Sequence, residues 1–176
     1  MKKVRRAVLG ILLLLISVQA CWAGASDYEK MVVPRTAVSW IEGQSLGDLV
    51  LGSRASVTFV YVDSKFGSFL RKNNGEAPEW LQWHAQEYGS HKGKALFAIQ
   101  IETFKPWNFA VEELTIAGYQ ITSADVLTKE EYRPFGELPS KFKGEFTVVI
   151  PAKLLQRGKE ISLGYGDYRT TLLVPK

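Results

Sequence analysis

The sequence predicts a mainly β protein, built as a single β-sandwich with one short amphipathic helix inserted between its strands. Eight short segments are rich in β-branched and aromatic residues. Turn residues separate these segments at intervals typical of sandwich proteins, and a single internal segment has helical character instead,. A jelly roll or a small closed barrel is the alternative arrangement for such strands.

The first residues of the chain have the pattern of an export signal. Four of the first six residues are basic, and residues 10–18 form an uncharged apolar run. This run is too short to span a bilayer comfortably, whereas a basic segment followed by an apolar one is typical of secretory signals. We therefore expect residues 1–20 to direct export, with cleavage before Cys21 or after Ala23 or Ala25.

Cys21 follows a small residue, Ala20, at the end of this apolar run. The segment resembles the lipobox of bacterial lipoproteins, and the resemblance implies that Cys21 is lipidated and becomes the mature N-terminus. Small residues at Ala23 and Ala25 are also typical of ordinary signal-peptidase sites, so both processing routes stay open. Either route predicts an exported protein, in the periplasm or as an outer-membrane or cell-surface lipoprotein.

The net charge of +4 belongs to the export signal. The chain has 22 basic and 18 acidic residues. Because four basic residues lie within the first six positions, the chain from Cys21 onward carries 18 of each sign. A neutral exported part argues against a nucleic-acid partner. Cys21 is also the only cysteine, so the fold must be stabilised by packing and not by an intrachain disulfide.

The elements are expected in the following order. Residues 21–35 have little periodicity and predict a tether, after which residues 36–176 form the sandwich domain. Residues 36–41 and 56–62 read as strands, and the second has apolar residues on both faces,. Residues 95–103 alternate between apolar and polar side chains, which predicts a strand with one face toward solvent.

The second half of the chain continues this pattern. Gly166 and Asp167 separate the last two segments by only two residues, which is typical of a tight hairpin. Residues 151–158 begin with proline and end with glycine, and so predict one or two helical turns. The arrangement is immunoglobulin-like in a loose sense only. The remaining strands are expected over residues 111–116, 119–122, 145–150, 161–165 and 168–174.

The inserted helix is expected over residues 78–88. This segment starts with Pro78 and Glu79, lacks β-branched residues and is followed by Gly89,. On a helical wheel its aromatic side chains share one wide arc, whereas Gln82 and Gln86 lie opposite.

This helix carries the first group of candidate binding residues. Exposed tryptophan and tyrosine side chains stack against sugar rings or against a partner's apolar side chains. The alternative is that the same arc packs onto the sheet as an ordinary covering helix. The candidates are Trp80, Trp83, His84, Glu87 and Tyr88.

Trp107 is the second candidate. It lies in an aromatic segment between two predicted strands, where proline and asparagine favour a turn,. Trp107 is therefore expected either to face a ligand from a loop or to cover the end of the core.

Few residues suit catalysis. His84 and His91 are the only histidines, and their spacing matches no standard zinc site,. Nucleophile, phosphate-binding and dinucleotide-binding motifs are absent from the sequence. We expect no cofactor and no metal. We also expect the chain to be a binding protein rather than an enzyme.

The sequence therefore predicts a non-enzymatic binding or assembly module of the bacterial envelope, with an envelope protein or a glycan as partner. Recognition would use the aromatic residues or addition of a strand at an open sheet edge. A hydrolase acting on envelope polymers through His84, Glu87 and a distant acidic residue, or a structural lipoprotein spacer, is the alternative.

Overall fold

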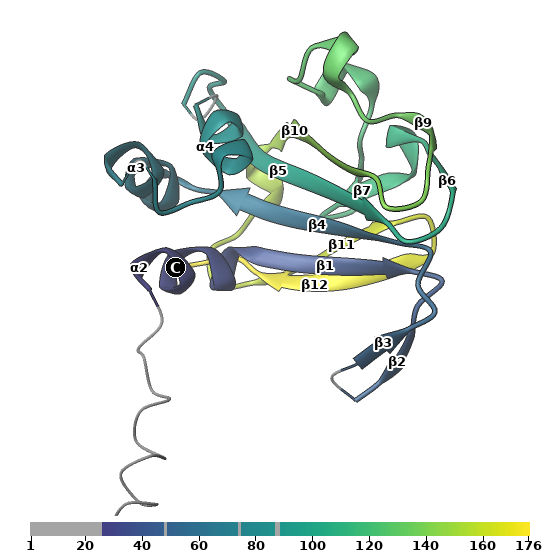
Figure 1. The fold of residues 1–176 in the computed structure, drawn as a ribbon. Helices are drawn as coiled ribbons and strands as arrows, with labels where there is room; N and C mark the ends of the chain where they lie inside the picture. Colours follow the sequence, from purple (N-terminus) through teal and green to yellow (C-terminus); the bar gives the residue numbers. More distant parts are fainter. Residues whose placement is uncertain (1–25, 48, 74, 87–88) are drawn as a thin grey trace, which may run out of the picture.

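The computed structural model describes residues 26–47, 49–73, 75–86 and 89–176 (Figure 1). The predicted export segment, Cys21, Glu87 and Tyr88 lie outside the described residues. In the part of the chain that the structure describes, no helix has the length and apolar character needed to cross a bilayer.

The described chain begins with helical turns, where the sequence predicted a tether over residues 21–35. Helix α2 (Asp27–Val32) starts at a capping box, in which Ser26 and Glu29 each accept a hydrogen bond from the other's backbone N–H,. A 3-10 turn, η2 (Val33–Arg35), leads into the first strand. The described part of the predicted tether is therefore helical, because local capping satisfies its first backbone donors.

Four antiparallel strands form the first sheet, in the order β1-β4-β5-β10 (Figure 1). The strand predicted over 36–41 matches β1, and the boundaries predicted for the other three strands of this sheet are correct within two residues. The strands are β1 (Thr36–Ile41), β4 (Ala55–Val62), β5 (Lys94–Thr103) and β10 (Lys143–Pro151).

The second sheet is also antiparallel and has the order β12-β11-β7-β8. The two strands of this sheet that come last in the sequence, β11 and β12, form the predicted hairpin. In it Tyr165 pairs with Tyr168 across Gly166 and Asp167. Gly166 has a φ of 53°, a left-handed conformation that glycine adopts at little cost. The strands are β7 (Leu114–Ile116), β8 (Tyr119–Gln120), β11 (Glu160–Tyr165) and β12 (Tyr168–Leu173).

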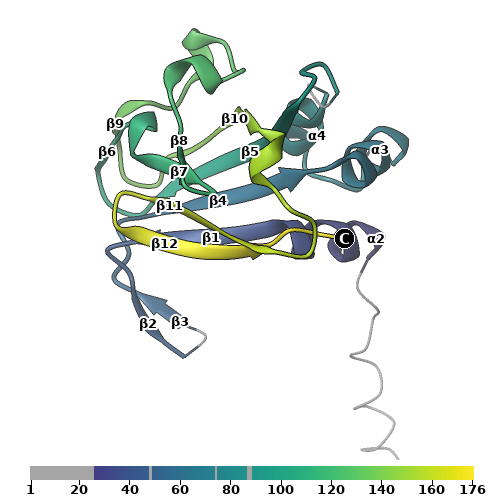
Figure 2. The same cartoon turned by 180° about the vertical axis from the view of Figure 1, so that it is seen from behind.

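The main core lies between the two sheets, which Figure 2 shows from behind. Phe59, Phe97 and Phe146 face this core from the first sheet, and Ile116 and Leu163 face it from the second. All five side chains are fully buried. Two packed sheets with a shared apolar interior confirm the predicted β-sandwich,.

Two helices, and not the single predicted one, cover the outer face of the first sheet. The predicted helix over 78–88 is α4 (Glu79–Ala85), and α3 (Ser64–Lys72) was not predicted. Asp63 caps α3 by accepting a hydrogen bond from the Phe66 N–H at 2.8 Å,. Phe66 and Leu70, one helical turn apart, are buried against the sheet. This helix was not predicted because its buried face is short and consists of Phe66, Gly67 and Leu70.

The helices create a second core on the outer face of the first sheet. Val60, Leu96 and Val149 pack there against Phe66 of α3 and Leu81 of α4. The helices therefore cover Leu96 and Ala98 on the side of residues 95–103 that was predicted to face solvent. Only the part of this side beyond the helices, at Gln100 and Glu102, is accessible to water.

Shorter elements complete the fold. Two ribbons are formed by β2 (Gln44–Leu46) with β3 (Leu49–Leu51) and by β6 (Trp107–Phe109) with β9 (Gly136–Leu138). The predicted strand 111–116 begins as a 3-10 turn, and the predicted helical turns in 151–158 are a 3-10 turn too. The 3-10 turns are η3 (Val111–Glu113), η4 (Ser123–Asp125), η5 (Glu130–Tyr132) and η6 (Ala152–Leu154).

Candidate functional site

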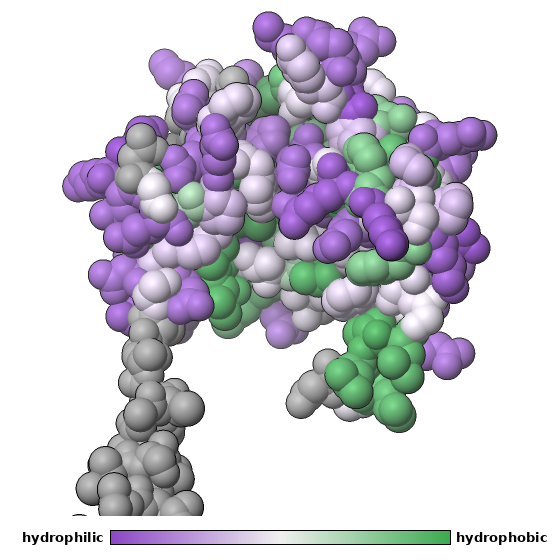
Figure 3. Space-filling model, viewed as in Figure 1, coloured by the Kyte–Doolittle hydropathy of each residue, from purple (hydrophilic) through white to green (hydrophobic). Residues whose placement is uncertain are grey.

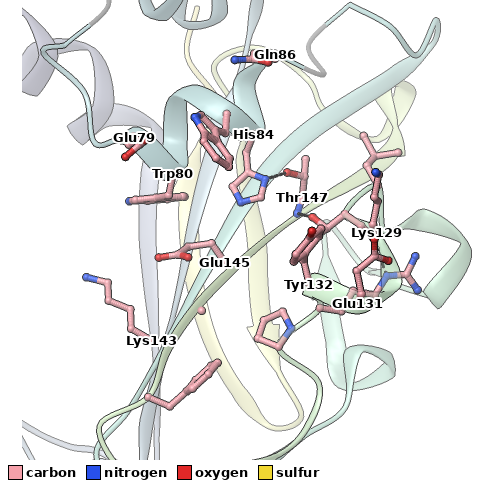
Figure 4. Close-up of a pocket in the computed structure, with 17 residues that line it drawn as sticks. Glu79, Trp80, His84, Gln86, Lys129, Glu131, Tyr132, Lys143, Glu145 and Thr147 are labelled. Atoms are coloured by element: carbon pink, nitrogen blue, oxygen red, sulfur yellow. Dashed lines mark hydrogen bonds between the residues drawn. The ribbon is translucent and has the colours of Figure 1, made fainter.

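An open groove of about 890 Å³ lies where α4, β10 and the loop of residues 127–134 meet. Figure 4 shows Trp80 and His84 of α4 on one side and Tyr132 of the loop on the other. Glu145 and Thr147 of β10 lie between them. Helix, sheet edge and loop each supply one wall, so the groove exists only in the folded domain.

Helix α4 places its residues in the groove because Leu81 fixes its rotation. Leu81 is fully buried in the second core. Trp80 and His84, one turn apart, have ring centroids 6.1 Å from each other and face the groove. Trp83 also lines the groove, and 65% of its surface is exposed.

Thr147 connects all three walls of the groove. Its Oγ1 lies 2.6 Å from Nδ1 of His84, with the donor set by the histidine tautomer. Its backbone N–H donates to Oγ1 of Thr128 at 2.9 Å, and its carbonyl accepts from the N–H of Leu127 at 2.9 Å. Because Thr147 is only 1% exposed, these bonds are shielded from water and position α4 relative to the loop.

The loop is held closed by Arg133. Its Nε donates to the carbonyl oxygen of Thr128 at 2.8 Å, and a second guanidinium nitrogen donates to that of Val126 at 3.3 Å. These bonds leave Tyr132 on the outside of the loop, with 70% of its surface exposed. Tyr132 lines the groove opposite α4 and is a candidate that the sequence analysis missed.

The edge of β10 is open at the floor of the groove. Thr147 directs its N–H and carbonyl away from β5, toward Leu127 and Thr128. Because this direction alternates along an antiparallel strand, Lys143 and Glu145 direct their backbone groups the same way,. Within the described residues, no group pairs with the backbone N–H or carbonyl of Lys143 or Glu145.

The charges of the groove balance. Three acidic and three basic side chains line it, and Glu145 also accepts a hydrogen bond from the amide of Gln100 at 3.2 Å. Such a site does not select a ligand by net charge. The six charged residues are Glu79, Glu131, Glu145, Lys129, Arg133 and Lys143.

The structure brings three of the predicted site residues together and separates a fourth. Trp80, Trp83 and His84 share the groove. Trp107 lines a different, smaller pocket of about 520 Å³, and its ring packs 4.7 Å from that of Tyr165. Trp107 is partly buried and packs against the main core.

The described residues contain no group of three or more histidine, cysteine or acidic side chains arranged to hold a metal ion. Comparison of the chain with protein-family models, curated proteins and solved structures found no match.

Proposed function

We propose that this chain is an exported bacterial envelope protein that acts as a non-enzymatic binding module, and that the groove is its binding site. One observation carries the proposal. Trp83 and Tyr132, 65% and 70% exposed, stand on opposite walls of a groove whose floor is polar. Large aromatic side chains left in water beside a groove are typical of recognition sites.

The open edge of β10 favours a protein segment as the ligand. An extended peptide beside Lys143 and Glu145 would pair with their outward backbone groups and add a strand to the sheet. Alternate side chains of such a peptide would reach toward Trp83 and Tyr132. A glycan would use the aromatic faces alone, without the strand edge.

The first test replaces an aromatic wall of the groove. We expect Trp83→Ala to lose binding to an array of immobilised extended peptides. Its melting temperature should not change, because Trp83 is mostly exposed. Trp40→Ala is the matched control, since Trp40 is also exposed and lies outside the groove. Peptide capture that survives Trp83→Ala would contradict the proposal.

The second test separates the two ligand classes. Glu145→Pro removes a backbone N–H that points away from β5, so the sheet keeps its own hydrogen bonds. Peptide capture should fall in Glu145→Pro and persist in Glu145→Ala, which retains the N–H. Glycan binding would be equal in both variants and would be lost only in Trp83→Ala.

A hydrolase is the second candidate, because His84 shares the groove with Glu79, Glu131 and Glu145. The binding proposal expects purified protein to be inert toward glycan, peptide and ester substrates. Turnover that His84→Ala abolishes would overturn it in favour of the enzyme. A structural spacer would need neither Trp83 nor Tyr132 at the surface.

A further inference from the structure

A second set of exposed apolar side chains lies outside the groove. Three of them belong to the β2–β3 ribbon, where Leu46, Leu49 and Leu51 are 67%, 63% and 52% exposed. Figure 3 shows this ribbon as an apolar finger that projects from the body. Leucines exposed in such a cluster are unusual on a domain surface that contacts only water.

Polar contacts at the base of the ribbon hold it away from the body. The Arg54 guanidinium donates to the Glu42 carboxylate at 2.8 Å and to the carbonyl of Pro106 at 2.8 Å. Lys105 donates to the carbonyl of Gly52 at 3.1 Å. These bonds fix where the ribbon leaves and rejoins the domain, so its leucines are presented outward by the fold itself.

Other exposed apolar residues lie near the base of the ribbon. Trp40 of β1 stacks on Phe104 with ring centroids 6.2 Å apart, and both are exposed. Tyr168 begins β12, the strand beside β1, and is exposed as well. Figures 1 and 2 both place the ribbon, β1, β12 and α2 along one side of the molecule. We call the three leucines of the ribbon, together with Trp40, Phe104 and Tyr168 near its base, the apolar edge.

The described chain begins at α2, on the same side of the molecule as the ribbon. Helix α2 begins at Asp27, and Cys21, the predicted lipidation site, lies five residues before Ser26. Five residues span at most about 18 Å when fully extended. A lipid on Cys21 would therefore hold this side of the domain close to a membrane surface.

We propose that the apolar edge contacts a lipid surface, with the leucines of the ribbon at the boundary between headgroups and acyl chains and Trp40 and Tyr168 at headgroup level. Leucine suits the apolar layer, and tryptophan and tyrosine prefer the interface because each has an apolar ring with a polar group. A projecting finger suits a fluid bilayer, which can surround it. A second rigid copy would need a matching apolar surface, whereas the groove between α4, β10 and the loop of residues 127–134 is lined by six charged side chains.

The experiment uses the single cysteine of the chain. Cys21→Ser gives a cysteine-free background, into which Leu49→Cys is introduced and labelled with an environment-sensitive fluorophore. The labelled full chain is mixed with vesicles of phosphatidylethanolamine and phosphatidylglycerol. We expect a several-fold rise in emission, a blue shift, and quenching by lipids that carry a quencher in the acyl chain. Leu46→Cys is the second labelling position if Leu49→Cys folds poorly.

Two controls make the outcome specific. A label at Lys129→Cys, on the groove loop, should keep its aqueous spectrum even when residues 1–25 bring the protein to the vesicle. The pair Leu46→Asn and Leu51→Asn should abolish the response at position 49. An unchanged spectrum at position 49 would overturn the proposal. So would a change that grows with protein concentration in the absence of vesicles, because that result indicates a second copy of the chain. Trp83→Ala should not affect this signal, so the two proposals fail independently.

Discussion

Arg35 connects the N-terminal helical turns to the rest of the domain. Its guanidinium donates twice to the Asp63 carboxylate, at 3.0 and 2.8 Å, and once to the carbonyl of Met31 at 2.8 Å. It also lies over the ring of Phe66, 5.7 Å from the centroid. Since Asp63 caps α3 and Met31 belongs to α2, Arg35 of η2 links α2 to α3.

Removal of Arg35 should destabilise the fold strongly. The side chain is 5% exposed and its partner 19%, so Arg35→Ala leaves a largely buried carboxylate without its cation. We expect a loss of about 3 kcal/mol in the free energy of unfolding, measured by urea denaturation. Lys30→Ala is the control, because the Lys30–Asp27 pair is exposed and contributes little,. Equal losses in both variants would contradict this role for Arg35.

The Glu42–Arg54 pair predicts a pH effect. The hydrogen bond from Arg54 lowers the pKa of the Glu42 carboxyl below its ordinary value. A depressed carboxyl pKa stabilises the fold above the unfolded-state pKa, and this stabilisation is lost as the pH falls through the folded-state pKa. NMR titration should give Glu42 a midpoint below that of a free glutamate, and Arg54→Gln should raise it. The same midpoint in both proteins would contradict the pairing.

At the scale of elements, the attachment of α4 to β10 depends on a threonine hydroxyl. Thr147→Val keeps the volume of the side chain but removes the partner of Nδ1 of His84. We expect a loss of about 1–2 kcal/mol in stability, measured by thermal unfolding, together with weaker ligand capture. Thr171→Val, at an exposed position of β12, should change neither. Unchanged capture in Thr147→Val would mean that α4 does not need this bond to form the groove.

The elements that alternate in hydrophobicity could be predicted from the sequence, and those fixed by single contacts could not. Residues 36–41 and 168–174 carry β-branched and aromatic residues at regular spacing, and both proved to be strands within one residue. Residues 26–35 lack such a pattern, and their helical turns depend on the Ser26–Glu29 capping box and on Arg35. Tyr132 was missed for a similar reason, because Arg133 shapes its loop through hydrogen bonds to backbone carbonyls.

At the scale of the whole molecule, the first sheet lies between two cores, and this predicts a gradient of local stability. Residues of β4 and β5 contribute to both cores, whereas β2 and β3 pair only with each other. Hydrogen exchange should therefore be slowest in β4 and β5 and fastest in the β2–β3 ribbon, because local opening follows the burial of each segment. Slow exchange in the ribbon would indicate that its leucines are already covered in solution.

The site as a whole shows the limit of sequence analysis. Trp80, Trp83 and His84 were identified as candidates because they lie within one helical segment. Their partners Tyr132 and Glu145 come from a loop and an edge strand about 50 and 60 residues further along, and only the three-dimensional fold places them across the groove. A pattern within one element is readable from sequence, whereas a surface shared by three elements is not.

The contact between β1 and β12 constrains the order in which parts of the newly made chain fold. The Ser39 hydroxyl donates to the carbonyl of Tyr168 at 3.0 Å, across 129 positions of sequence. A chain emerges from the ribosome N-terminus first, so β1 can pair with β4 early. β12 becomes available to β1 only when synthesis is nearly complete. Such a distant contact also slows folding, because a long loop must close before the contact forms. The contact between β1, the first strand made, and β12 therefore forms last. A truncated chain that lacks β12 would leave β1 exposed to incorrect pairing with other chains.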